Sequence, residues 1–293
     1  IPATFIIIPW LSIYNWWNLY KGSVERYKID FPKHKIIIMC NEEVDYKIFK
    51  SLGINSFFCN QNALIDTNIF KIRTLKKKYD VIYNARLVPT KRHYLLSGIK
   101  LKNIGLISAQ LNARYNQVYL EKIKKIIPNA TLVNYANNPT LSGVDFSQPL
   151  PQLDDIQVSK LLNNSRVGVI LSRIEGACYA STEYLLAGIP VVSTNNRGGR
   201  DIFFSKEYCI TVFPRRGSVK NAVNRLICCD VDPIYIRNNT LLKMKPHLER
   251  FQNILQKEFD RFDISMDVKD NWENIFVNKM IQYANDYKQH FFK

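Results

Sequence analysis

The sequence predicts an α/β protein built on parallel sheets. Short apolar runs of strand length alternate with longer segments of helical spacing along most of the 293 residues. Glycine, proline and asparagine separate many of these segments, as expected of turns. The hydrophobic fraction of 46% and the charged fraction of 23% are those of a globular protein with core for one large or two ordinary domains. Strands that alternate with helices favour parallel sheets.

The first part of the chain predicts a compact βαβαβ unit. Its first helical segment carries Trp16, Trp17, Tyr20 and Tyr27 at helical spacing, which is more typical of a core than of a stacking platform. Its second helical segment is closed by Gly53. The expected elements are strands at 4–8, 35–40 and 56–59 and helices at 11–27 and 44–52.

A second α/β series follows a charged segment at 71–79. This segment contains Lys76, Lys77 and Lys78 and is interpreted as a linker, because a charge run usually forms a solvated surface. From Pro233 the pattern is helical to Phe292. The second series is expected to contain strands at 80–85, 104–108, 131–134, 167–172, 191–194 and 209–212, with helices at 91–99, 115–127, 154–163 and 218–227 and a short helix before Gly188.

Charge and cysteine content narrow the class of protein. The net charge of +16 favours anionic partners, namely nucleotide phosphates, nucleic acid or an acidic membrane surface, without choosing among them. The six cysteines lack metal-binding spacing, and the adjacent Cys228 and Cys229 argue against disulfides, so reduced cytoplasmic thiols are expected. No apolar run reaches about 18 residues, so no spanning helix is expected. The chain begins at Ile1 without methionine or signal-peptide features, as expected of a processed form or an excised domain.

The most informative segment lies between Glu175 and Glu183. It follows an apolar strand that ends at Ser172, and Gly188 and Pro190 end its helix before the next strand. Parallel sheets bind nucleotide ligands beyond the carboxyl ends of their strands, and a carboxylate there can accept hydrogen bonds from sugar hydroxyls. The alternative is a surface acid and a buried, ion-paired acid. Backbone amides that could face phosphates belong to Gly176, Ala177, Cys178 and Tyr179.

Basic residues follow an earlier strand of the same series. Arg86 offers a planar guanidinium suited to phosphate oxygens, and Lys91 a mobile ammonium. Lys91 is expected near a helix N-terminus, where a cation is favourable only if an anion is bound. The alternative is a pair of solvent-facing residues in a chain with 41 Lys and Arg. In the polar loop at 194–201, Gly198 and Gly199 allow either close approach of a ligand or a plain turn.

Taken in order, these stretches resemble the retaining, nucleotide-sugar-dependent glycosyltransferases with the GT-B fold. Residues 84–91 resemble the phosphate-binding Arg and Lys loop of that family, and 175–183 its E-x7-E motif. Residues 187–194 with Gly198-Gly199 resemble the segment after that motif, and 271–273 with the following helix resemble its C-terminal helix. The resemblance is good from about residue 79 to 215 and poor before it.

The resemblance implies two Rossmann-like parallel-sheet domains, the N-terminal one unusually short, with C-terminal helices returning to it. The expected domains are 1–76 on the acceptor side, 77–250 for the donor, and helices at 251–293. Arg86 and Lys91 would bind the donor diphosphate, Glu183 the ribose and Glu175 the donor sugar, with the amides of 176–179 on phosphate. The family's glycine-rich loop near the first strand is absent, and residues 8–11 stand there.

The implied activity is transfer of a sugar from a nucleoside diphosphate to a hydroxyl of a glycan or lipid-linked glycan, with anomeric configuration retained. No metal or other cofactor is required, since Arg86 and Lys91 would neutralise the leaving group. The expected setting is bacterial surface polysaccharide assembly, in the cytoplasm and in peripheral contact with the anionic inner membrane face. The alternatives are a nucleotide-sugar epimerase of the same architecture, a basic nucleic-acid-binding protein, for which no motif is present, and a silent scaffold domain.

Overall fold

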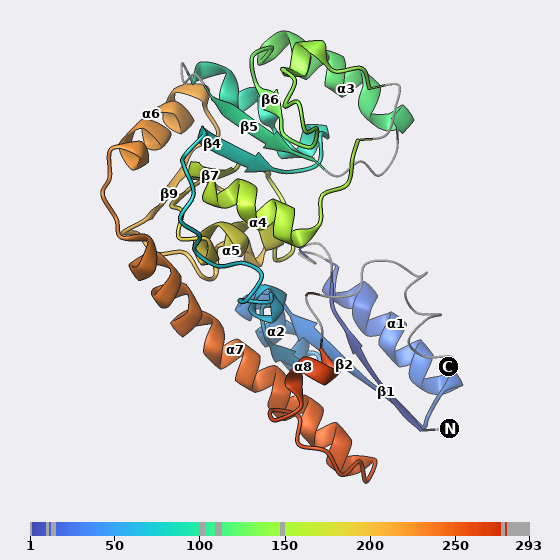
Figure 1. Ribbon diagram of the computed structural model, residues 1–293. Helices are drawn as coiled ribbons and strands as arrows, with labels where there is room; N and C mark the ends of the chain where they lie inside the picture. Colours follow the sequence, from blue (N-terminus) through green and yellow to red (C-terminus); the bar gives the residue numbers. More distant parts are fainter. Residues whose placement is uncertain are drawn as a thin grey trace. The chain divides into compact units, whose positions relative to one another are not determined.

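A computed structural model describes residues 2–9, 12, 16–99, 103–108, 113–146, 150–276 and 279. The chain divides into two compact units (Figure 1). The first unit consists of Ile1–Asp66 and Lys243–Lys293, and the second of Thr67–Leu242. Chain segments that are distant in sequence therefore build the first unit, whereas the second is continuous.

The first unit contains a three-stranded parallel sheet in the order β1-β2-β3. Because side chains alternate along a strand, Ile36 and Ile38 of β2 pack against one face with Phe49, while Ile37 and Met39 face the opposite core. Its elements up to residue 64 are β1 (Ala3–Ile7), α1 (Trp17–Asp30), β2 (His34–Cys40), α2 (Glu43–Ser51), β3 (Ser56–Phe58) and the 3₁₀ segment η1 (Gln61–Leu64).

The aromatic residues of α1 are largely core, as the sequence predicts. Trp17, Tyr20 and Tyr27 pack against the cluster around Val24 and Phe49, and the Trp17 indole donates a hydrogen bond to Asp45 Oδ1 at 2.8 Å. The expectation is wrong for Trp16, which is 59% exposed, because it precedes the first turn of the helix.

C-terminal helices cover the other face of this sheet. Phe251 stacks on Phe57 with ring centroids 6.2 Å apart, and Trp272 meets Phe251 edge-on at 6.0 Å. The predicted return of the C-terminal helices to the N-terminal domain is therefore confirmed. The continuous helix that the sequence predicts to Phe292 is not observed, because α7 ends at Arg261 in a turn. Residues 277–278 and 280–293 lie outside the described part. The helices are α7 (Pro233–Arg261) and α8 (Trp272–Ile275).

The second unit contains a six-stranded parallel sheet in the order β6-β5-β4-β7-β8-β9. The chain starts at the centre, moves out to one edge, and returns to the other side of β4, where β7 pairs with it (Figure 1). This is the doubly wound order of dinucleotide-binding domains, in which ligands bind beyond the carboxyl ends of the strands at the reversal. The strands are β4 (Tyr79–Asn84), β5 (Ile104–Ile107), β6 (Thr131–Leu132), β7 (Ser165–Ile170), β8 (Val191–Thr194) and β9 (Cys209–Val212).

Helices connect these strands and bury a continuous apolar core. Buried strand residues such as Val81, Leu106 and Val167 pack with Leu120 and Leu226 from the helices. The connecting elements are α3 (Ala113–Ile126), η4 (Leu141–Gly143), α4 (Asp155–Asn163), α5 (Tyr179–Leu186), η5 (Gly199–Asp201) and α6 (Arg216–Ile227). Apart from their ends and the shorter β6, these strands and helices lie where the sequence predicts them.

The helix predicted at 91–99 is the main exception in this unit. Two 3₁₀ segments occupy the region, η2 (Pro89–Lys91) and η3 (His93–Gly98), and Arg92 between them has a left-handed backbone with φ 52°. A left-handed residue cannot continue a right-handed helix. Lys91 therefore does not lie at the N-terminus of an α-helix as expected.

The predicted linker is also part of this unit rather than a free connection. The Asn163 side chain accepts a hydrogen bond from the backbone N–H of Arg73 at 2.6 Å and donates one to Lys71 O at 2.9 Å. Lys77 Nζ donates to Asn163 O at 2.9 Å. Residues 71–78 are thus held against the end of α4, and β4 begins directly after them.

Candidate functional site

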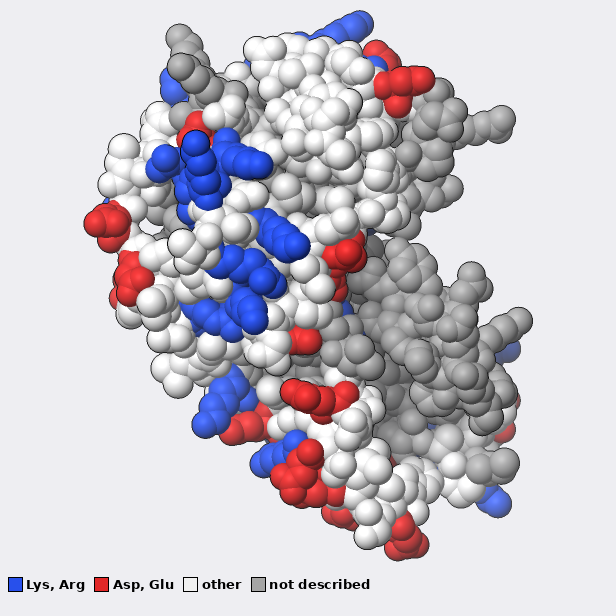
Figure 2. Space-filling view, viewed as in Figure 1, with Lys and Arg blue, Asp and Glu red and all other residues white. Residues whose placement is uncertain are grey.

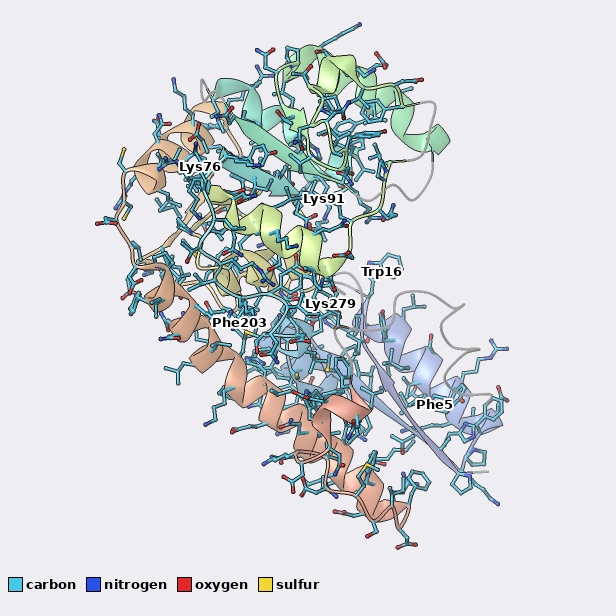
Figure 3. All side chains as sticks on the ribbon, in the orientation of Figure 1. Phe5, Trp16, Lys76, Lys91, Phe203 and Lys279 are labelled. Carbon is cyan, nitrogen blue, oxygen red and sulfur yellow. The ribbon has the colours of Figure 1, made fainter. Side chains whose placement is uncertain are left out.

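Loops after β4 and β7 bring Lys91 and Glu175 together. Lys91 Nζ donates a short hydrogen bond to Glu175 Oε1, and the two side chains are only 14% and 10% exposed. Lys91, labelled in Figure 3, comes from the segment after β4, and Glu175 from the loop after the neighbouring β7. The structure therefore places these two sequence-predicted residues in one largely buried ion pair at the carboxyl edge of the sheet.

Glu183 lies at the same edge, on α5. Its side chain is buried at 3% exposure and accepts a hydrogen bond from Asn84 Nδ2 at 3.4 Å. The backbone N–H of Asn84 donates to Tyr184 Oη at 2.7 Å. A Cβ at Gly168 would overlap the Tyr184 ring, so the glycine in β7 allows α5 to pack closely against the strand. Glu183 is thereby fixed beside the end of β4.

The loop between the two glutamates turns sharply before α5. Cys178 has a left-handed backbone with φ 58°, and its carbonyl accepts from Ser181 N at 3.0 Å and Ser181 Oγ at 2.7 Å. Burial raises the pKa of the Cys178 thiol to about 12, aided by the charge of Glu175. The thiol therefore stays protonated at neutral pH and is not a nucleophile. Gly176 and Ala177 are buried in this loop, and Tyr179 is half-buried.

The loop after β8 supports the Glu175 loop through the backbone. Glu175 N donates to Arg197 O at 3.0 Å, and Arg197 N donates to Arg173 O at 3.1 Å. Gly198 has φ 116°, and a Cβ there would collide with Glu175 O. This glycine is therefore needed because the backbone of the neighbouring loop approaches it closely.

Arg86 does not join this cluster in the structure. It is exposed after β4 and forms no ion pair with any residue the structure describes. Its carbonyl accepts from Val88 N at 2.8 Å, which sets the turn toward Lys91. Of the sequence-predicted charged residues, Glu175 and Glu183 are therefore buried at this edge and Lys91 is largely buried, while Arg86 faces solvent.

Sequence reasoning missed the tyrosine beneath Lys91. Tyr83 Oη donates to Lys91 O at 2.6 Å and accepts from Leu171 N at 3.3 Å. Burial raises the pKa of Tyr83 well above its usual value, so the hydroxyl remains a donor. In the sequence of a strand, a tyrosine that hydrogen-bonds a neighbouring loop cannot be distinguished from any other apolar residue. The sequence therefore did not indicate the role of Tyr83.

Histidine 93 lies next to this tyrosine. The rings of His93 and Tyr83 are 4.8 Å apart, and His93 Nδ1 lies 3.2 Å from Tyr119 Oη. Burial, and then the charge of Lys91, lowers the pKa of His93 to about 3. The ring is therefore neutral, and it is a weak base at physiological pH.

Sequence reasoning also missed two guanidinium groups that lie between the ends of β7 and β8. Arg92 Nε donates to Leu171 O at 2.5 Å, and its Nη2 to Thr194 Oγ1 at 2.8 Å. Arg200 Nη1 donates to Ser172 O at 2.8 Å and to Ser172 Oγ at 2.9 Å. Its Nη2 donates to Ser193 Oγ at 2.9 Å and to Thr194 O. The only sequence signal was the position of both residues in polar loops at strand ends.

Across the described ranges, no three His, Cys, Asp or Glu side chains gather as metal ligands. Across the same ranges, no helix has the length and apolar character needed to span a bilayer.

The parallel sheets, the doubly wound order of the second unit and the returning C-terminal helices define the fold of the GT-B glycosyltransferases. No family model and no curated protein matches the sequence. Among solved structures, Anabaena HepE in complex with UDP and glucose is 15% identical, with a TM-score of 0.61 over 87% of this chain and 71% of that chain.

Two further solved structures share the fold at low identity. Sucrose-phosphate synthase from Thermosynechococcus elongatus is 13% identical, with a TM-score of 0.56 over 77% of this chain and 59% of that chain. The pneumococcal O-GlcNAc transferase GtfA, in complex with UDP and GlcNAc, is 11% identical, with a TM-score of 0.58 over 86% of this chain and 52% of that chain. The chain thus spans little more than half the length of these two enzymes.

Proposed function

We propose that the protein is a retaining glycosyltransferase that moves a sugar from a nucleoside diphosphate to a hydroxyl of a glycan or lipid-linked glycan. The observation that carries the proposal is the ion pair of Lys91 with Glu175 where the strand order reverses at β4 and β7, with Glu183 buried at the same sheet edge. Solved proteins of this fold include HepE with UDP-glucose and GtfA with UDP and GlcNAc. The biological setting we propose is bacterial surface polysaccharide assembly.

In this proposal the cations stabilise the leaving diphosphate, which gains negative charge as the glycosidic bond breaks. Glu175 takes one hydrogen bond of the Lys91 ammonium and holds it at the sheet edge. The remaining N–H donors of Lys91 serve the phosphate oxygens. Arg86, which is exposed on the same loop, closes over the diphosphate from the solvent side.

The glutamates orient the two sugars of the donor in this scheme. Glu183 binds the ribose and Glu175 the transferred sugar, while the amides of 176–179 contact phosphate. Neutral His93 and protonated Cys178 are unsuited to act as the base. The leaving phosphate itself accepts the proton of the attacking hydroxyl, which is consistent with retention of configuration and requires no metal.

The first experiment is a thermal-shift screen of the purified chain against UDP-, GDP-, ADP-, dTDP- and CMP-linked sugars. A ligand at about 100 times its dissociation constant adds about 2.7 kcal/mol of stability. The stabilising donor is then incubated with a glycan acceptor in excess EDTA, and transfer is expected. Strict dependence on added metal argues against the proposed neutralisation by Arg86 and Lys91.

The same experiments separate the alternatives. Conversion of the donor sugar without an acceptor indicates an epimerase. Binding that ignores nucleotide sugars and weakens steeply with salt indicates a nucleic-acid-binding protein. Absence of any nucleotide binding indicates a silent scaffold, and the proposed function then fails.

Peripheral membrane contact is a further part of the proposal, supported by surface charge. Figure 2 shows Lys and Arg side chains gathered on a face of the second unit, where Figure 3 labels Lys76. Such a surface suits anionic lipid head groups, and each basic residue near the bilayer contributes about 1 kcal/mol. The exposed basic residues of the 71–78 segment, α4 and β7 in this basic strip are Lys71, Lys76, Lys77, Lys78, Lys160 and Arg166.

A flotation assay at physiological salt tests this contact, using vesicles of phosphatidylcholine with and without phosphatidylserine. The wild-type chain is expected to float only with the anionic vesicles. The double variant Lys76→Glu, Lys78→Glu should stay at the bottom. The double variant Lys206→Glu, Lys257→Glu makes the same charge change at exposed sites outside the strip and should still float. Equal flotation of both variants contradicts a role for the strip.

A further inference from the structure

Arg200 is a buried cation and Arg92 is a half-buried one, and neither forms an ion pair with another described residue. Their guanidinium groups donate to carbonyls and hydroxyls at the ends of β7 and β8. Arg200 is 1% exposed, and its Nε has no hydrogen-bond partner among the described residues. Buried charges are ordinarily paired because removing them from water is costly. Arg200, which is buried without an ion pair, is therefore an unusual feature that calls for a nearby anion.

The guanidinium groups of Arg92 and Arg200 interact electrostatically with each other and with the loop that carries Glu175. Burial lowers the pKa of both guanidinium groups, and each remains charged at neutral pH. The positive charge of Arg200 also lowers the pKa of Arg92. Cys178, Tyr83, Glu175 and Asp201 raise the pKa of Arg200, which places its guanidinium within electrostatic range of the loop before α5. Glu175, the carboxylate of that loop, is already paired with Lys91.

Backbone geometry supports a functional reason for this arrangement. Arg92 adopts a left-handed conformation, which costs energy for any residue with a Cβ and is common at ligand sites. Its guanidinium shares Thr194 with Arg200, Arg92 bonding the hydroxyl and Arg200 the carbonyl. The strained residue thus brings its charge next to that of Arg200.

We propose that the buried Arg200 and the half-buried Arg92 form a cationic cluster beneath the 175–179 loop, and that its positive charge favours binding of the donor diphosphate. They act as positioning residues through the ends of β7 and β8 and through their charge, without touching the substrate. The proposal rests on the proposed function, since it takes a nucleoside diphosphate as the ligand. To the charges of Lys91 and Arg86 it adds that of Arg200, which salt screens little because the side chain is buried.

The test compares the affinities of nucleoside and nucleoside diphosphate for the purified full chain. The diphosphate preference is the ratio of the affinity for the nucleoside diphosphate to the affinity for the nucleoside. Isothermal titration of the wild type with UDP and uridine measures it; if another base stabilises the chain better, the guanosine, adenosine or thymidine pair is used instead. Arg200→Met removes the buried charge and keeps the apolar stem, and it should lower this preference by about tenfold or more. Arg200→Lys keeps the charge and should retain most of the preference. Arg225→Met, on the exposed side of α6, is the matched control and should leave it unchanged.

Arg92→Gly provides a second route if Arg200→Met does not fold. Glycine is favoured at φ 52°, so this variant removes the charge and relieves the backbone strain together. It should also lower the diphosphate preference, and in the wild type that preference should persist from 0.1 to 0.5 M NaCl.

If the role of these residues is merely structural, the affinities for uridine and UDP fall in parallel in Arg200→Met or in Arg92→Gly. A structural role also predicts that Arg200→Lys binds like Arg200→Met. Either result overturns the inference while the proposed function stands. A wild-type chain that binds none of the nucleoside diphosphates overturns the proposed function itself, and the inference with it.

Discussion

At the scale of single residues, the ion pair between Lys91 and Glu175 sets the chemistry of the site. Both side chains are largely buried, so removing one partner leaves the other charge without compensation. The two residues come from different loops, and their pairing also fixes the distance between those loops. Function and local structure are thus coupled at these positions.

Turnover is expected to fall by about two orders of magnitude or more in Lys91→Ala and in Glu175→Ala, because each removes a group that stabilises the transition state. Steady-state rates with the donor found in the nucleotide-sugar screen check this. Lys206→Ala, at an exposed position, is the control and should keep full activity. Full activity in either site variant removes the role proposed for that residue.

At the scale of elements, the packing of α5 on β7 depends on one glycine. The Tyr184 ring occupies the space where a side chain at position 168 would lie, and Tyr184 Oη receives the backbone N–H of Asn84. A methyl group at that position must displace the ring or the strand. The placement of Glu183, the residue before this tyrosine, changes with either displacement.

Gly168→Ala is therefore expected to lower the free energy of unfolding by about 1–3 kcal/mol or more through overpacking. Urea denaturation of the two proteins measures the difference. Gly217→Ala is a matched control in α6, where nothing lies within 4 Å of the added Cβ, and it should be neutral or stabilising. A Gly168→Ala variant as stable as the wild type contradicts the close packing described here.

The elements of the second unit could be predicted because periodicity and turn residues mark them. Glu175 and Glu183 were identifiable since a strand, a glycine and a helix surround them in a recognisable order. The 3₁₀ segments at 89–98 were not predictable, because the left-handed backbone of Arg92 depends on bonds to Leu171 and Thr194, which are distant in sequence. Arg200 was missed for a similar reason: arginine is ordinarily exposed, and only the tertiary fold buries it.

At the scale of the whole molecule, each unit contains a buried neutral histidine. Burial lowers the pKa of His93 to about 3 and that of His247 to about 4, with smaller effects from Lys91 and Arg250. Both values lie below the unfolded value of about 6.5. As pH falls, the unfolded chain therefore takes up protons first. The stability contribution is complete above about pH 6.5 and is lost progressively toward the folded values.

Acid is thus expected to destabilise the chain, and His93 alone should account for about 2 kcal/mol between pH 7 and pH 5. Denaturant unfolding at pH 7, 6 and 5 checks this in the wild type and in His93→Asn, whose amide can replace the contact with Tyr119. The loss of stability with falling pH should be smaller in the variant. Parallel losses in the two proteins contradict the assignment.

The interleaved order of the two units has a consequence for biosynthesis. Residues 67–242 are complete once Leu242 has been synthesised, whereas Phe251 and Trp272, which cover one side of the β1-β2-β3 sheet, come later in the chain. During synthesis, this apolar face of the first unit therefore stays uncovered until the residues after Leu242 have been made. Exposed apolar surface of this kind makes a nascent chain prone to aggregation.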